Sequence, residues 1–148
     1  MAFGYSYNRR GGYSKRTTPY RSGFEDKVTT VLKNASVPFE YEKYKIEYSI
    51  PSTEHIYTPD IVLSNNIIIE IKGLFETADR QKHMLIKQQY PNLDIRFLFQ
   101  NANNAIYKGS KTTYATWCEK YGFKYANKEL PLSWLKEPKK DAKGLIKK

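Results

Sequence analysis

The sequence predicts a mixed α/β domain in which a central mixed sheet is flanked by helices. Three observations support this fold class: helical periodicity in three separate segments, two apolar β-branched runs around a short polar turn, and further short extended segments between the helices. A chain of 148 residues fits one domain with modest tails. We place a flexible basic arm at 1–20, the folded domain at 21–137 and a basic C-terminal tail at 138–148.

The first helix is predicted to begin at Ser22. The segment Ser22-Gly23-Phe24-Glu25 has the spacing of a capping box, in which the serine caps the helix and the glutamate reaches back to it. Apolar residues then recur on one helical face, at Phe24, Val28, Val31, Leu32 and Ala35. The helix should end near 34–36, before Pro38.

An extended segment is predicted over 39–50, because apolar and polar residues alternate there. The alternation slips at Glu42–Lys43, which indicates a bulge or a break between two strands. The next segment, 51–55, has the composition of a turn or loop.

Two apolar runs, 57–63 and 67–72, flank the polar turn 64–66 and predict a β-hairpin. A helix should follow from Thr77 or Ala78 to Gln89, and Pro91 stops it. The remaining elements are expected in this order: a strand at 94–99, a loop at 100–104, a helix at 112–121 closed by Gly122, a short strand at 123–125 and an apolar docking segment at 130–135.

The register of this hairpin predicts a chemical site. If the turn centres on Asn65, Asp60 faces Glu70, and directly opposed residues have Cβ atoms roughly 5 Å apart. Lys72 lies two residues beyond Glu70 and therefore points to the same face. The other face is apolar and suited to burial, with Ile61, Leu63, Ile67, Ile69 and Ile71.

Two opposed carboxylates repel each other, and a divalent cation resolves the conflict. Mg²⁺ is held by one or two carboxylates together with water and phosphate oxygens, and the Ile71 carbonyl could complete its shell. Lys72 could then orient the attacking water or stabilise charge on the reacting phosphate. The alternative is a salt-bridged edge of Asp60, Glu70 and Lys72 on a solvated face.

The charge distribution indicates a polyanionic partner. The formal net charge is +10, and most of the excess lies in residues 1–24 and 136–148. Such basic arms commonly bind nucleic acid, although they can also be solubilising tails. Cys118 is the single cysteine, which excludes an internal disulfide and disfavours structural zinc. We expect no signal peptide, no membrane association and a cytoplasmic location.

The motif Pro59-Asp60, nine residues, then Glu70-Ile71-Lys72 resembles the signature of the restriction-endonuclease-like nucleases. The surrounding sequence is similar to phage endonuclease I, the Holliday-junction resolvase family of T-odd coliphages. The resemblance covers about 20–140, and its most specific stretches are Tyr20–Lys27, Phe39–Glu42, His55–Asp60, Glu70–Leu74, Leu93–Arg96, Tyr107–Ser110, Cys118–Lys120 and Trp134–Lys140.

This resemblance implies a restriction-endonuclease-like core at 21–137 and an intertwined, domain-swapped homodimer. It implies cleavage of four-way junctions and other branched DNA with Mg²⁺ or Mn²⁺, leaving 5′-phosphates. The catalytic residues implied are Glu25, Asp60, Glu70 and Lys72, and the metal ligands are Asp60, Glu70, Ile71 and Glu25. Glu25 would come from the partner chain, a role that can coexist with helix capping. If a phage encodes the chain, the location is the host cytoplasm.

Basic residues outside this centre are candidates for DNA contact: Arg9, Arg10, Arg16, His55, Arg80, Lys82, Lys87, Lys108 and Lys111. Each of them could instead be an ordinary solvated or structural side chain. Two rival functions stay open at this point. One is a sequence-specific restriction-type endonuclease, and the other is a non-catalytic DNA-binding protein.

Overall fold

The computed structural model describes residues 22–50 and 53–147. The predicted arm 1–20, with Arg9, Arg10 and Arg16, lies outside the described residues. Within the described ranges, no helix is long and apolar enough to cross a membrane.

The described elements follow one another as the sequence predicts in outline. The helices are α1 (Gly23–Asn34), α2 (Thr77–Gln89), α3 (Tyr114–Tyr121) and a 3-10 helix at Leu132–Lys136. The strands are β1 (Phe39–Tyr41), β2 (Tyr44–Ile50), β3 (Thr53–Tyr57), β4 (Ile61–Leu63), β5 (Ile68–Lys72), β6 (Ile95–Phe99), β7 (Lys124–Asn127) and β8 (Ile146–Lys147).

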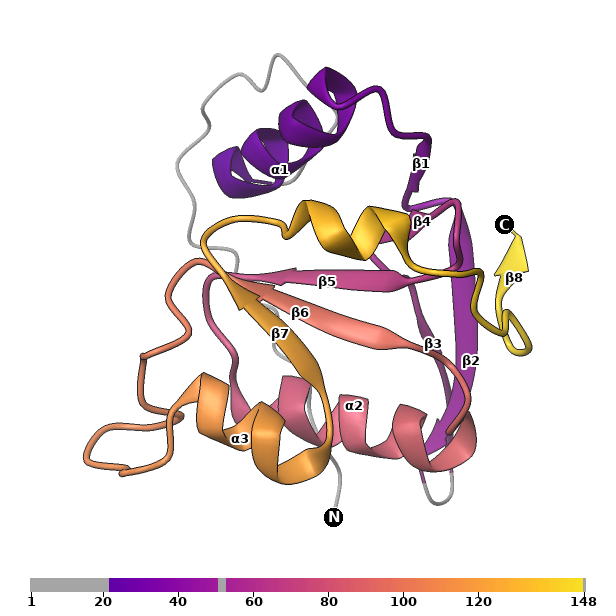
Figure 1. Ribbon diagram of the computed structural model, residues 1–148. Helices are drawn as coiled ribbons and strands as arrows, with labels where there is room; N and C mark the ends of the chain where they lie inside the picture. The colour runs from indigo at the N-terminus through magenta and orange to yellow at the C-terminus, as the bar shows by residue number, and fades with distance from the viewer. Residues whose placement is uncertain (1–21, 51–52, 148) are drawn as a thin grey trace.

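Five strands form the central sheet in the order β1-β4-β5-β6-β7. The pairs β1·β4 and β4·β5 are antiparallel, whereas β5·β6 and β6·β7 are parallel, so the sheet is mixed as predicted. A smaller antiparallel sheet, β3-β2-β8, stands beside it (Figure 1). Because β5, β6 and β7 are parallel, their carboxyl ends meet at one edge of the central sheet.

Helices cover both faces of the central sheet, with α1 and the 3-10 helix on one side and α2 and α3 on the other (Figure 1). Val28 and Leu32 of α1 pack on the odd-numbered isoleucines of the hairpin, which include Ile61 and Ile69. The even-numbered side of the hairpin packs with Ile86 of α2. An aromatic cluster joins α3 to β6. The predicted apolar face of the hairpin is therefore confirmed as core.

The break predicted at Glu42–Lys43 is confirmed. Residues 39–41 pair with β4 in the central sheet. In the smaller sheet, residues 44–45 pair with β8 and residues 46–50 pair with β3. Glu42 has a φ of 49°, a left-handed conformation that turns the chain between the two strands. The slip in alternation therefore marks the point where the chain changes sheets.

Two strand predictions were wrong in their boundaries. The run 57–63 is two strands, β3 and β4, because Thr58, Pro59 and Asp60 interrupt it, and proline has no N–H to donate to a ladder. Residues 53–55, predicted as loop, belong to β3, where Thr53 pairs with Ile50. Pairing with β2 extends this strand although its local composition is polar.

The C-terminal segment is fastened by a buried arginine. Arg96 of β6 is fully buried, and its guanidinium donates to the carboxylates of Asp94 at 2.8 Å and Glu137 at 2.5 Å. Its guanidinium also lies 5.1 Å from the ring centroid of Trp134. Lys140 donates its backbone N–H to the Asn65 carbonyl at 2.8 Å. The predicted tail, 138–148, is therefore bound to the body of the domain at Lys140.

We expect acid to weaken this fastening. Hydrogen bonds from Arg96, with support from Lys140, lower the pKa of Glu137 to about 2. Its stabilising contribution is thus complete above the unfolded pKa of about 4.3 and is lost as pH falls towards 2. Glu137→Gln should cost about 1–3 kcal/mol at pH 7. In this variant the urea concentration at the midpoint of unfolding should fall less steeply between pH 4.5 and 2 than in the wild type. The exposed control Glu129→Gln should show the same pH dependence as the wild type.

Candidate active site

The hairpin brings the predicted carboxylates together. Ile61 pairs with Ile69 and Val62 with Ile68, which places Asp60 opposite Glu70, as the register predicted. Both side chains are buried, at 6% and 4% exposure. The Asp60 Oδ2 accepts the backbone N–H of Ile71 at 2.9 Å. The Ile71 carbonyl points to the same side of its strand as that N–H, hence towards Asp60.

Glu25 joins this cluster from α1 of the same chain. Ser22 caps the helix, because its Oγ accepts the Glu25 backbone N–H at 3.0 Å. The Glu25 carboxylate is buried, and its Oε2 accepts a hydrogen bond from the Tyr41 hydroxyl. The serine half of the predicted capping box is therefore confirmed, while the glutamate side chain points into the acidic cluster.

Glu42 is a fourth acid that the sequence did not single out. One carboxylate oxygen from each of Glu25, Glu42 and Asp60 lies within 4.8 Å of the other two. The Glu42 backbone N–H also donates to the Asp60 carbonyl at 3.2 Å. The slip in alternation at Glu42 was the sequence feature that could have identified it as a site residue. A break in a strand changes the direction of the side chains at the break.

Lys72 stands at the end of β5 between acids. Its Nζ lies 3.6 Å from Glu70 Oε1 and 3.2 Å from Asp79 Oδ1. Asp79 also lies 4.0 Å from the Lys82 Nζ. Burial lowers the pKa of Lys72, but the charges of Glu70 and Asp79 outweigh this and raise it above its ordinary value. The lysine is therefore an ammonium ion in the site.

The electrostatics of the cluster fit a divalent cation. Burial raises the pKa of Asp60 well above its usual range, and the charges of Glu70 and Glu25 raise it further. Burial, followed by the charge of Glu70, also raises the pKa of Tyr57, so its hydroxyl keeps its proton. Crowded, desolvated carboxylate oxygens are the hard ligands that Mg²⁺ and Mn²⁺ bind. Glu25, Glu42 and Asp60, whose grouped carboxylate oxygens are described above, could hold such an ion. Glu70, a predicted ligand, faces Asp60 from the neighbouring strand but is not part of that group of three.

Comparison with known proteins assigns the family. The family model described as phage endonuclease I matches residues 1–147. The chain belongs to the phage endonuclease I family. It is 49% identical over 127 residues to endonuclease I of Escherichia phage T7, covering 86% of this chain and 85% of the relative. It is 48% identical over 134 residues to endodeoxyribonuclease 1 of Enterobacteria phage T3, covering 88% of each. This phage endonuclease is thus an enzyme of the deoxyribonuclease class.

Some basic candidates lie near the carboxyl edge of the sheet in this endonuclease. The loop after β6 begins beside Lys72, since Gln100 N–H donates to the Lys72 carbonyl at 2.9 Å. Lys108 and Lys111 are exposed on this loop. Lys82 flanks the site through Asp79, and His55 on β3 contacts Thr53 Oγ1 at 2.9 Å. DNA contact by these four side chains stays a prediction.

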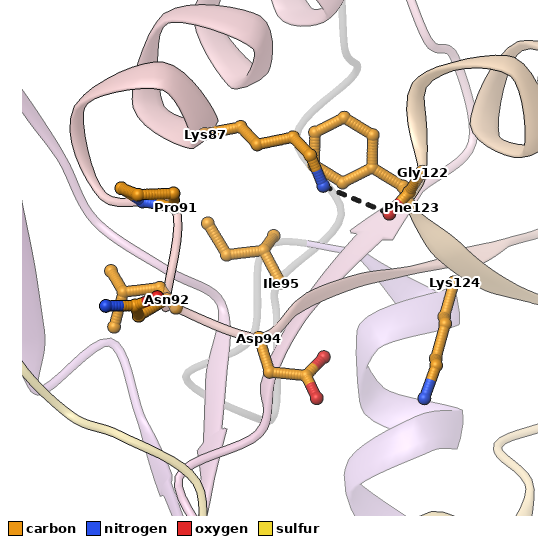
Figure 2. Close-up of a pocket in the computed structure, with 9 residues that line it drawn as sticks. Lys87, Pro91, Asn92, Asp94, Ile95, Gly122, Phe123 and Lys124 are labelled. Atoms are coloured by element: carbon orange, nitrogen blue, oxygen red, sulfur yellow. Dashed lines mark hydrogen bonds between the residues drawn. The ribbon is translucent and has the colours of Figure 1, made fainter.

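Arg80 and Lys87 already make contacts within the protein. Arg80 is buried, and it donates to the Phe75 carbonyl at 2.5 Å and the Ile106 carbonyl at 3.3 Å. The Lys87 Nζ donates to the Gly122 carbonyl at 3.0 Å beside the Phe123 ring (Figure 2). That lysine lines a cavity of about 230 Å³. Contact with DNA would require the buried Arg80 to exchange its partners, whereas the half-buried Lys87 ammonium keeps further donors besides the one that Gly122 accepts.

We expect the acidic cluster to destabilise the metal-free protein. Because the folded state raises the pKa of Asp60, its contribution is favourable at low pH and is lost as pH rises through the folded pKa. In EDTA at pH 8, Asp60→Asn should raise the free energy of unfolding, because the substitution removes a buried negative charge that lies close to the charges of Glu70 and Glu25. The gain should shrink as pH falls towards 4.

Urea unfolding with and without Mn²⁺ checks this expectation. The wild type should gain stability from the cation through mass action, and Asp60→Asn should gain much less. The exposed control Asp141→Asn should behave as the wild type in both conditions. A variant that is no more stable than the wild type in EDTA at pH 8 would contradict the electrostatic account.

Proposed function

We propose that this protein is a structure-selective endonuclease that resolves four-way DNA junctions and cleaves other branched DNA. The observation that carries the proposal is the buried acidic group of Glu25, Asp60 and Glu42, with Glu70 opposite Asp60 and beside the Lys72 ammonium, in a chain of the phage endonuclease I family. The reaction is hydrolysis of a phosphodiester. The water oxygen bonds to phosphorus as the bond to O3′ breaks, which leaves a 5′-phosphate and a 3′-hydroxyl.

A Mg²⁺ ion, or Mn²⁺ in its place, would polarise the phosphate and lower the pKa of a bound water. Asp60 and Glu70 would hold it, with Glu25, Glu42 and the Ile71 carbonyl as further oxygen donors. The hydrogen bond from Ile71 to Asp60 fixes one ligand before the ion binds. Burial of the cluster keeps bulk water from screening the charges that the reaction develops.

Besides the metal ion, Lys72 supplies a positive charge to the site. Its ammonium lies 3.6 Å from Glu70 and is held by Asp79 at 3.2 Å. In that position it can orient the attacking water or stabilise the negative charge that grows on the phosphate oxygens. The ion pair with Asp79 restricts the lysine to this place. The ammonium therefore loses little further conformational freedom when substrate binds.

The DNA would approach along the carboxyl edge of the central sheet. The loop that carries Lys108 and Lys111 begins beside Lys72, and Lys82 lies near Lys72 because both ammonium groups are close to Asp79. Contacts of this kind are with phosphates, so they read backbone shape and carry no base sequence directly. Selection of branched DNA by shape is consistent with the small size of the domain, which leaves little room for base-reading elements.

The enzyme is proposed to act as an intertwined homodimer with two centres, which suits paired cuts across a branch. In the described single chain, Glu25 completes the site of its own chain. Exchange of α1 between chains would preserve the same contacts while making them intermolecular. The turn at Glu42 lies between α1 and the rest of the site and is the proposed crossing point.

Removal of one acid tests catalysis separately from binding. Glu70→Gln keeps the shape of the side chain but removes its charge, so cleavage of a four-way junction in Mg²⁺ should fall at least about 100-fold. Junction affinity in EDTA should be unchanged. The surface control Glu119→Gln should cut normally. If Glu70→Gln cleaves the junction at the wild-type rate, the site assignment is wrong.

Substrate choice is read in the same assay. The wild type should cut the junction much faster than a linear duplex of the same sequence, and end-labelling should find 5′-phosphates. Equal rates on both substrates, with cuts at one fixed sequence, would support a restriction-type enzyme. Binding without cutting in any divalent cation would support a non-catalytic protein.

Mixed dimers test whether Glu25 acts in the partner's site. In an exchanged dimer of one Glu25→Gln chain and one Glu70→Gln chain, both substitutions fall in one site, and the other site is intact. Such a dimer should nick one strand of the junction. Without exchange, both sites would be damaged and the dimer would be inactive.

A reciprocal dimer makes the opposite prediction. When one chain carries Glu25→Gln and Glu70→Gln together and its partner is wild type, exchange damages both sites and abolishes cleavage. The unexchanged arrangement leaves one site intact and gives a single nick. Co-expression with two affinity tags isolates each mixed dimer, and a four-way junction labelled on each strand reports the nicks.

A further inference from the structure

Two tyrosine hydroxyls donate hydrogen bonds to acids of the site, and neither tyrosine has a role in the proposed reaction. The Tyr57 hydroxyl donates to Glu70 Oε2, and the Tyr41 hydroxyl donates to Glu25 Oε2. Tyr57 lies on β3 and is 3% exposed, while Tyr41 ends β1. The two phenols reach the cluster from different sheets.

The described hydrogen bonds engage one oxygen in each of three acids, Asp60, Glu70 and Glu25. Asp60 accepts the Ile71 N–H on Oδ2, and each glutamate accepts a tyrosine on Oε2. The Glu70 Oε1 is the atom nearest the Lys72 ammonium, at 3.6 Å. Each of these three carboxylates is therefore held by a hydrogen bond on one oxygen, and in Glu70 the second oxygen lies beside the Lys72 ammonium.

Packing fixes the direction of the Tyr57 hydroxyl. Its ring meets His83 edge-on, with centroids 5.0 Å apart and planes at 81°. The Lys82 Nζ lies 5.1 Å from the ring centroid. His83 is fully buried, and neither of its ring nitrogens has a hydrogen-bond partner among the described residues. This histidine thus serves as a packing surface, and Tyr57 cannot swing away without opening the core.

We propose that Tyr57 and Tyr41 are positioning residues, which hold Glu70 and Glu25 so that one oxygen of each faces the cation. A carboxylate without such a donor can rotate, and it must be ordered again each time the ion binds. Hydrogen bonds to metal-ligating carboxylates of this kind are typically worth 10–100-fold in metal affinity or activity. The inference rests on the proposed function of the acidic cluster.

The chain offers a matched control for the loss of one hydroxyl. The Tyr125 hydroxyl donates to Glu119 Oε1 at 2.8 Å on the surface. Tyr125→Phe therefore removes the same kind of bond, a phenol to a carboxylate, away from the site. Tyr57→Phe keeps the aromatic ring and its contacts with His83 and Lys82.

The experiment compares Tyr57→Phe, Tyr41→Phe and Tyr125→Phe in the full chain. Calorimetric titration with Mn²⁺ in the absence of DNA should give 10–100-fold weaker binding for Tyr57→Phe and a smaller loss for Tyr41→Phe. The Mg²⁺ concentration at half-maximal junction cleavage should rise by a similar factor. Junction affinity in EDTA should stay at the wild-type value, a separation that general loss of structure would not produce. Tyr125→Phe should match the wild type throughout.

The outcomes separate this inference from the function on which it rests. Wild-type metal affinity in both Tyr57→Phe and Tyr41→Phe overturns the positioning role, while junction cleavage by the wild type leaves the proposed function standing. If the wild type does not cut branched DNA, the proposed function itself is wrong. Should Tyr57→Phe lose its circular dichroism signal, the Tyr41→Phe titration decides.

Discussion

The antiparallel register of β4 and β5 is the constraint on which the site depends. It sets Asp60 opposite Glu70 while the odd-numbered isoleucines of the same strands enter the core. A slip of one residue would exchange the face of one strand that packs on α1 with the face that packs on α2, and it would separate the two acids. The hydrophobic effect therefore maintains a pairing of two acids that electrostatics alone would oppose.

The same apolar surface delivers the distant acids. Helix α1 packs Val28 and Leu32 on the hairpin, and this packing places Glu25 against Asp60. The left-handed turn at Glu42 then moves the chain from one sheet to the other beside the cluster. One hydrophobic contact thus serves both the stability of the fold and the assembly of the site.

The cluster holds a balance between stability and function. Burial, together with the charges of Glu70 and Glu25, raises the pKa of Asp60 and weakens the metal-free fold. The hydrogen bond from Ile71 and the charge of Lys72 act in the opposite direction. A cation would reverse this balance, because it binds the folded state alone. Arg96 and Glu137 hold the C-terminal segment by an ion pair that needs no metal.

The sequence by itself determined the elements whose signals are local. These were the Ser22 cap, the break at 42–43, and the hairpin register that joins Asp60, Glu70 and Lys72. Tertiary structure alone decided which side chains meet across the sheets. It brought Glu42 and the two tyrosines to the site, and it turned Arg80 and Lys87 towards protein carbonyls. The physical reason is range: backbone periodicity constrains residues a few positions apart, whereas long side chains take the partners that packing of the whole domain presents.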